Sequence, residues 1–359
     1  VLILNDFTEE FKYAGVSETV NMRAEGSADS GIMRAVEAGE ELTVFEQGTK
    51  WTKVTTADGL VGYIPSEDVT VQRTELIDTG FKEPEYTSIK YDEKINLVWH
   101  QVTSAAGNVT LTDYTAKVKN VNVISPTWFT LKDTQGNIDC YATTDYVQQA
   151  HSMGMKVWAL IDDFATDDKG GRCIRDILPR TSRRERLINQ LMSYAKEYNL
   201  DGINVDFEYI NTDNGENYVQ FLRELSVECR KAGIVLSVDN YVASAWTIHY
   251  DRKEQSIVCD YLIIMGYDEH TSGSETAGSV ASLPFVRTGI EKTIEEVGSS
   301  EKVINALPFF TRIWTENKNG GLSSEAVGME GAASAIAAAN AKKNWSEEEG
   351  QYYCEYKSG

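Results

Sequence analysis

The sequence predicts an α/β protein in which a (β/α)8 barrel is preceded by a small all-β barrel. The chain has 359 residues, a length that suggests about two domains. Up to about residue 72 it consists of short alternating segments separated by turn residues, and from about residue 95 of apolar strands separated by helical stretches. The first pattern is typical of small β-barrels, and the second implies a parallel sheet with right-handed crossovers.

The small β-barrel is expected over residues 16–72. Its clearest strands are Glu41–Phe45, Trp51–Val54 and Leu60–Ile64, with Gly39, Gly48 and the pair Asp58-Gly59 at the turns. Residues 1–15 fit neither domain and are left unassigned. The polar stretch 73–93, which contains Gly80 and Pro84, is expected to be a linker to a barrel over residues 94–359.

The second domain contains seven candidate strands, whereas a closed TIM barrel has eight. The strands are expected at 95–100, 121–129, 156–161, 202–207, 235–238, 261–265 and 303–307, with helices at 183–198, 218–232, 286–297 and 331–344. An open doubly wound sheet is the alternative, and the absence of a GxGxxG motif after the first strand weakens it.

Composition excludes several classes of function. The chain has 34 basic and 55 acidic residues, and its net charge of -21 argues against binding nucleic acid or an anionic membrane through bulk electrostatics. No apolar run approaches the ~18 residues of a membrane span. Five scattered cysteines and four histidines show no metal-ligand spacing, so neither a metal nor another cofactor is expected.

The most informative stretch runs from Asp201 to Glu208. Side chains alternate along a strand, so Asn204, Asp206 and Glu208 are expected to point to one side and the apolar residues between them to the other. The apolar side suits the face that helices cover, and the polar side then faces the barrel interior. Glu208 falls at the carboxyl end of its strand, where barrel active sites form, and crowding by Asp206 should raise the pKa of one carboxyl.

This stretch, DGINVDFE, resembles the DGxDxDxE signature of glycoside hydrolase family 18, the chitinase-like family. Asn204 replaces the first inner Asp, which resembles the spore-cortex and cell-wall N-acetylglucosaminidase branch. Met265–His270 resembles the MxYD motif of the family in its YDEH form. The segments 124–128 and 307–314 resemble its second and seventh strands, and together the resemblance covers about residues 90–359.

The resemblance implies a retaining, substrate-assisted glycosidase without a metal, an exception to the usual scheme of two carboxylates. Glu208 would protonate the glycosidic oxygen while the 2-acetamido oxygen of the substrate attacks the anomeric carbon and forms an oxazolinium ion. Asp206 would hold the acetamido N–H, Tyr267 would donate a hydrogen bond to the acetamido oxygen, and Asp268 would bind sugar hydroxyls. Asn204 removes a charge, which implies a shifted pH optimum.

Aromatic residues near strand ends are candidates for sugar binding, because pyranose rings stack on aromatic faces. Trp314 and Trp128 lie just beyond candidate strands and are expected to bind substrate, with core packing as the alternative for Trp128. Asn240 follows the fifth strand and is a further substrate-binding candidate, for which a core or loop role is equally compatible.

The region 17–72 resembles a bacterial Src-homology-3-like domain. The residues that carry the resemblance include Val20–Arg23, Trp51–Val54 and Gly62–Ile64. The resemblance implies contact with peptidoglycan or another wall component, which would raise the local concentration of substrate. A packing or spacer role is the alternative.

The expected function is hydrolysis of β-linked N-acetylglucosamine in peptidoglycan or chitin-like glycans, outside the cell or at the wall. A non-catalytic glycan-binding protein on the same fold is the alternative, which retention of Glu208 disfavours. The chain is expected to end before the eighth strand, unless residues 352–356 supply it.

Overall fold

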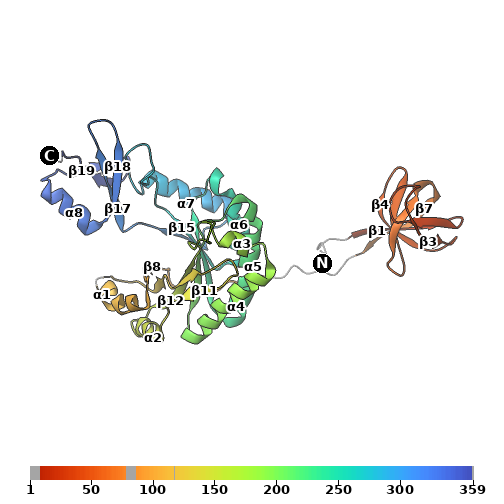
Figure 1. Cartoon of the computed structure of the whole chain (residues 1–359), viewed down its shortest axis with the longest axis horizontal. Helices are drawn as coiled ribbons and strands as arrows, with labels where there is room; N and C mark the ends of the chain where they lie inside the picture. The colour runs from red at the N-terminus through yellow and green to blue at the C-terminus, as the bar shows by residue number, and fades with distance from the viewer. Residues whose placement is uncertain (1–8, 78–85, 117, 358–359) are drawn as a thin grey trace. The chain divides into compact units, whose positions relative to one another are not determined.

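The chain divides into two compact units between Glu85 and Tyr86 (Figure 1). The structure, a computed structural model, describes residues 9–77, 86–116 and 118–357.

The first unit is a seven-stranded antiparallel sheet in the order β3-β2-β6-β5-β4-β1-β7. A 3-10 turn at Ser66–Asp68 leads into the last strand. The strands are β1 Glu9–Val16, β2 Val20–Arg23, β3 Ile32–Val36, β4 Leu42–Gln47, β5 Trp51–Thr56, β6 Val61–Pro65 and β7 Val69–Ile77.

Alternation along the strands builds the core of this unit. On β5, Thr52, Val54 and Thr56 are buried while the residues between them are partly exposed. The core consists of Val16, Met22, Val36, Leu42, Val54 and Ile64. Gly62 lies so close to Met22 that a Cβ at this position would fall 2.5 Å from its Cγ, so β2 and β6 require glycine there.

The structure corrects the expected ends of this unit. Residues 9–15, left unassigned in the sequence, form β1 together with Val16, and this strand pairs with both β4 and β7. Residues 73–77, expected in a linker, continue β7. Neither end has a strongly apolar alternating pattern, because this long ribbon carries charged side chains such as Lys12 and Arg73 on its surface. Residues 1–8 and 78–85 lie outside the described residues.

The second unit contains a curled parallel sheet of seven strands in sequential order, with a β10–β11 hairpin added beside β12. The seven strands are β8 Leu97–His100, β9 Val123–Pro126, β12 Lys156–Asp162, β13 Gly202–Asp206, β14 Val235–Tyr241, β15 Tyr261–Met265 and β16 Val303–Ala306; the hairpin strands are β10 Phe129–Leu131 and β11 Ile138–Cys140. A doubly wound sheet would reverse its strand order, and this sheet does not. The predicted (β/α)8 class therefore holds.

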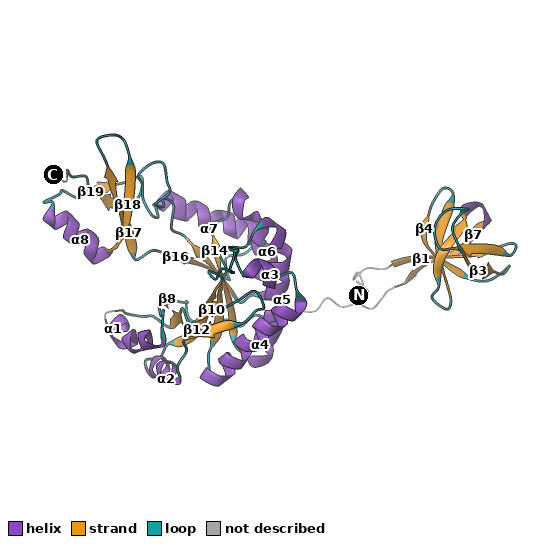
Figure 2. Cartoon of the chain, viewed as in Figure 1, coloured by secondary structure: helices purple, strands orange, loops and turns teal. Residues whose placement is uncertain are grey.

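Helices follow the strands on the outer side of the sheet (Figure 2). They are α1 Leu111–Thr115, α2 Thr144–Ser152, α3 Ile174–Ile177, α4 Thr181–Tyr198, α5 Gly215–Ala232, α6 Arg252–Val258 and α7 Leu283–Val297, with 3-10 turns η2 Ala105–Thr110, η3 Thr212–Asn214 and η4 Ala245–Tyr250. α4 and α5 end at Asn199 and Gly233, which both adopt the left-handed conformation common at helix C-termini. The side chain of Ser282 caps α7 by accepting the N–H of Phe285.

Residues 86–93, also expected in the linker, pack against the amino ends of the strands. Ile89 donates its backbone N–H to Asp260, and Tyr91 donates its backbone N–H to the hydroxyl of Tyr261. Both side chains contact the buried cluster around Trp158. The partners in these hydrogen bonds lie 171 and 170 positions away in the sequence, so nothing in the local sequence indicates them.

After β16 the chain forms a small separate layer. β17 Phe310–Glu316 and β18 Leu322–Gly328 make one hairpin, α8 Met329–Ala338 follows, and β19 Asn344–Ser346 pairs with β20 Gln351–Tyr353. The alternative that 352–356 supply an eighth barrel strand is therefore wrong, because β20 pairs antiparallel with β19. Over the described ranges, no strand joins β16 to β8. In the same ranges no helix is both long and apolar enough to cross a membrane.

Candidate active site

The polar residues of β13 point into the sheet's concave side, and its apolar residues pack beneath the helices. Phe207 stacks on Phe221 of α5 with ring centres 5.5 Å apart, and Ile203 and Val205 are fully buried in the main core. Asn204, Asp206 and, just past the strand, Glu208 occupy the opposite face. The alternation along the strand thus gathers three polar groups inside the sheet.

Three aspartates form a row across neighbouring strands. Asp162 on β12 pairs in register with Asp206 on β13, and the ladder between β13 and β14 brings Asp239 to the level of Asp206. Burial raises the pKa of all three carboxyls, that of Asp239 to about 8, and the charge of Asp239 adds to the rise at Asp206. At neutral pH this row holds protons that exposed aspartates would have lost.

Glu208 is held from two sides. Its Oε2 accepts a hydrogen bond of 2.5 Å from the hydroxyl of Tyr241, and its backbone N–H donates to Oδ1 of Asp163 at 2.9 Å. Burial raises the pKa of Glu208, the bond from Tyr241 opposes the rise, and the charges of Asp268 and Asp162 add to it. The result is a half-buried carboxyl whose pKa lies above that of an exposed glutamate, the direction in which a general acid is adjusted.

Asp163 and Arg252 support this arrangement from behind. Asp163 is fully buried and accepts the N–H groups of both Glu208 and Tyr209, and burial raises its pKa to about 7. Arg252 is also fully buried, pairs with Glu296 at 3.1 Å and donates to the backbone carbonyl of Tyr241. Both partners of the Glu208–Tyr241 hydrogen bond are therefore anchored through their backbones.

Tyr267 and Asp268 follow the carboxyl end of β15. Burial raises the pKa of the Tyr267 phenol, and the nearby carboxylates Asp239, Asp206 and Glu208 raise it further, so the phenol stays neutral and can donate a hydrogen bond. Its ring packs edge-on against Phe310 at 6.2 Å. Asp268 is exposed and adopts a left-handed backbone conformation with φ +60, and the positive charge of Arg312 lies near its carboxylate.

The structure corrects two of the predicted sugar-binding residues. The side chain of Trp128 is fully buried, and its Nε1 donates to Oδ1 of Asn108 at 2.7 Å, so it belongs to the core. Asn240 is also fully buried and donates to Gln255 of α6 at 2.7 Å. The strand β14 continues to Tyr241, so alternation turns Asn240 toward the helices and Asp239 and Tyr241 toward the site.

Asn204 lies at the floor of the site and makes only protein contacts. Its Oδ1 accepts hydrogen bonds from Trp99 and Ser125, and its Nδ2 donates to Ser237 and Asp239. The amide is fully buried and fully paired. Its geometry is that of a bridge between strands, so it does not match the predicted contact with substrate.

Trp314 lies on β17, outside the parallel sheet. It is partly exposed, and its Nε1 donates to the carbonyl of Gly278 in the loop after β15 at 2.9 Å. This bond fixes the indole relative to the loop that carries Tyr267 and Asp268. A role in sugar binding stays a prediction.

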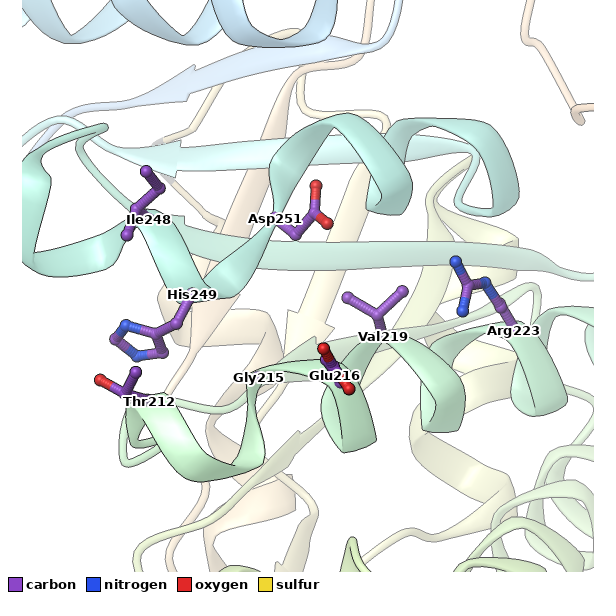
Figure 3. A pocket seen from close by; sticks show the side chains of 8 residues that line it. All are labelled: Thr212, Gly215, Glu216, Val219, Arg223, Ile248, His249 and Asp251. Carbon is purple, nitrogen blue, oxygen red and sulfur yellow. The ribbon is translucent and has the colours of Figure 1, made fainter. Parts of the chain in front are cut away.

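A cavity of about 430 Å³ does not include this site. Figure 3 shows its lining, which comes from the start of α5 and from η4 and includes Glu216, Val219, Arg223 and His249. None of the predicted site residues lines it. Among the described residues, no group of three or more His, Cys, Asp or Glu side chains is placed to hold a metal ion.

Of Asp163, Asp239 and Tyr241, sequence reasoning misses Asp239. Tyr241 follows the predicted fifth strand and is a candidate to reach substrate, with a core or loop role equally compatible. The pair Asp162-Asp163 ends the predicted third strand at the active face, where a helix N-cap is the alternative. The sequence does contain a signal for Asp239 and Tyr241. Together with Ser237 they occupy alternate positions of β14, so they point to one face of the sheet, while Leu236, Val238 and Asn240 point to the other. Ending the strand at Val238 hid this alternation. For Asp163 the sequence predicts the place at the end of the third strand but not the partners, which are backbone groups 45 and 46 residues away.

Comparison with known families decides the assignment. The sequence model of "Glycosyl hydrolases family 18" matches residues 60–358, and that of "Bacterial SH3 domain" matches residues 18–70. The chain belongs to glycosyl hydrolase family 18. A bacterial SH3 domain stands at its N-terminal side.

Individual relatives are distant. The uncharacterized glycosylase YvbX of Bacillus subtilis is 28% identical over 200 residues, which cover 54% of this chain and 57% of YvbX. The chain thus spans a little over half the length of this curated relative. A chitinase from Chromobacterium violaceum has a TM-score of 0.62 at 20% identity, covering 73% of this chain and 82% of the chitinase. The spore cortex-lytic enzyme SleL of Bacillus megaterium has a TM-score of 0.62 at 18% identity, covering 80% of this chain and 66% of SleL.

Proposed function

We propose that this family 18 glycosidase cleaves β-linked N-acetylglucosamine by a retaining, substrate-assisted mechanism. The observation that carries the proposal is the convergence of Glu208, Asp206 and Tyr267 on one buried face at the carboxyl ends of β13 and β15. An acid with a raised pKa, a carboxylate and a neutral hydroxyl donor are the three groups that this chemistry needs.

Glu208 donates its proton to the glycosidic oxygen as the bond to the anomeric carbon breaks. The acetamido oxygen of the substrate attacks that carbon and forms the oxazolinium ion, and water then opens the ring while Glu208 takes a proton back. Asp206 accepts the acetamido N–H, and Tyr267 donates to the acetamido oxygen. Asp268, exposed at the rim, binds sugar hydroxyls, and Trp314 offers an indole face to a sugar ring.

Peptidoglycan is the substrate that we favour, and the chain would act outside the cell or at the wall. The structural similarity to an enzyme named for lysis of the spore cortex supports this choice. The bacterial SH3 domain supports it as well, because a second module that binds wall components would raise the local concentration of substrate.

Two measurements test this function. Purified peptidoglycan and chitin oligomers are digested in parallel, and mass spectrometry reads the released ends; new ends at N-acetylglucosamine from peptidoglycan support the proposal. A thiazoline that mimics the oxazolinium ion should compete with substrate. Oligosaccharide binding without new ends would instead indicate a non-catalytic glycan-binding protein, and hydrolysis that the thiazoline does not inhibit would contradict the mechanism.

A further inference from the structure

We propose that Asp239 is a positioning residue that shares one proton with Asp206, so that β14 supplies the second carboxyl of the site. This inference rests on the proposed function, because Asp206 is the group through which Asp239 acts. It concerns a residue that lies outside both catalytic motifs found in the sequence.

The first argument is register. The ladder between β13 and β14 pairs Asn204 with Ser237 and Val205 with Val238, and Asp206 and Asp239 are the next residues along the two parallel strands. Both side chains lie on the strand face that points into the site, and neighbouring strands in a sheet lie about 4.8 Å apart. Two carboxyls at this spacing cannot both ionise easily, so they hold one proton between them over a range of pH.

The second argument is the hydrogen bonding of Asn204. Its Nδ2 donates to one oxygen of Asp239, Oδ1, at 2.9 Å and to Ser237 at 3.0 Å, so both of its N–H donors are used. Its carbonyl oxygen accepts from Trp99 and Ser125. Asn204 therefore fixes Asp239 and has no donor left for its strand neighbour Asp206.

The third argument is the condition of Asp206 itself. Its Oδ1 is buried without a hydrogen-bond partner in the described part of the chain. Apart from burial, the charge of Asp239 is the largest cause of its raised pKa. A proton shared with Asp239 would satisfy this atom until substrate arrives. When the acetamido N–H binds Asp206, the proton stays on Asp239 and Asp206 accepts as the anion, so no proton is gained or lost.

The other titratable groups facing this pair do not provide an alternative counter-charge. They come from β12 and its end, from the segment after β13, from β14 and after β15, and from α5 and η4: Asp162, Asp163, Glu208, Tyr241, Tyr267, Tyr218 and Tyr250. All of them are acids or phenols, and none is a cation. Within this group Asp162 pairs in register with Asp206 on the β12 side, and Asp239 directly follows the last registered pair on the β14 side.

The test is a titration of aspartate side-chain carboxyls by ¹³C NMR on the full chain without substrate. In D239N, an isosteric change, we expect the Asp206 titration to move to lower pH by about one unit or more. D162N is the matched control, because it neutralises the other neighbouring carboxyl; Asp162 is already bonded to Thr130 at 2.7 Å. The Asp206 shift in D162N should be clearly smaller. An Asp206 midpoint unchanged in D239N, or moved equally in both variants, overturns the proposal.

The double variant N204D/D239N exchanges the two side chains. It places the second carboxyl on β13 and the amide on β14, so the floor of the site still holds one amide and one acid. It should restore the high-pH titration and recover most of the kcat, which in D239N should fall about tenfold or more. Failure of the swap to restore the titration contradicts proton sharing. Because the titration needs no substrate, its outcome is separate from the outcome for the proposed function, which the digestion of glycans decides.

Discussion

The hydroxyl of Tyr241 donates a hydrogen bond to Oε2 of Glu208, although the two residues lie 33 positions apart in the sequence. Tyr241 is the last residue of β14, and Glu208 follows β13, its parallel neighbour. A donor stabilises the carboxylate form of its acceptor, so this bond holds the pKa of Glu208 below the value that burial alone would impose. The tyrosine therefore adjusts the pH at which the acid loses its proton.

Replacing Tyr241 with Phe should move the alkaline limb of the kcat/KM profile to higher pH. The variant removes a bond that favours the charged form of Glu208, so the pKa of Glu208 rises and the acid stays protonated further into alkali. A hydrogen bond to a charged group is worth about 1.5–3 kcal/mol, which corresponds to a shift of about one pH unit or more. Y146F is the control, because that hydroxyl bonds His100 instead. A limb displaced to lower pH would refute this role.

Asp163 should stabilise the loop that carries Glu208. The D163A variant leaves the N–H groups of Glu208 and Tyr209 without their acceptor. Unfolding in urea should show a loss of about 1–3 kcal/mol for each orphaned group that stays buried, together with a reduced kcat. D213N, at an exposed site nearby, should change neither quantity. Full stability and kcat in D163A would show that the loop does not depend on this carboxylate.

Trp128 and Trp314 should separate into a core residue and a surface residue. W128A removes a fully buried ring and its bond to Asn108, and should cost about 3–5 kcal/mol of unfolding free energy. W314A should cost much less and should raise KM for N-acetylglucosamine oligomers, because a partly exposed indole can stack on a sugar. Equal KM values for W314A and the wild type would remove Trp314 from the substrate site.

The buried aspartates should make the protein less stable as pH rises from about 4 to 8. In the folded chain the pKa of Asp163 is about 7 and that of Asp239 about 8, against about 3.9 when unfolded. Between these values the folded state binds more protons, so the unfolding free energy falls with rising pH. Urea titrations at pH 5 and pH 8 should show this fall, and D239N should reduce it. A stability that increases over this interval would contradict the burial of neutral carboxyls.

Local pattern was enough to predict the barrel and the central motif. The expected strand 261–265 matches β15, and the expected strand 202–207 exceeds β13 by one residue. The period-two alternation around Asp206 also placed Glu208 at the correct end of its strand. These features depend on neighbours in the sequence, and this is why the sequence alone could predict them.

The features that could not be predicted depend on contacts between distant segments. β1 is a strand because β4 and β7 pair with it, and Asp163 accepts backbone N–H groups from the segment that follows β13. Trp128 is predicted to be a sugar platform because it lies at the carboxyl end of a predicted strand, but the chain turns into β10 and the ring is buried. Side-chain direction at the end of a strand depends on where that strand ends, and sequence patterns determine strand ends poorly.

Hydrolysis by the wild type and by E208Q tests the central claim most directly. Both proteins are incubated with N-acetylglucosamine oligomers, and E228Q, on an outer turn of α5, serves as the matched control. The account predicts cleavage by the wild type and E228Q, and a loss of about 100-fold or more in kcat for E208Q with an unchanged melting temperature. Cleavage by a stable E208Q at the wild-type rate would show that Glu208 is not the acid.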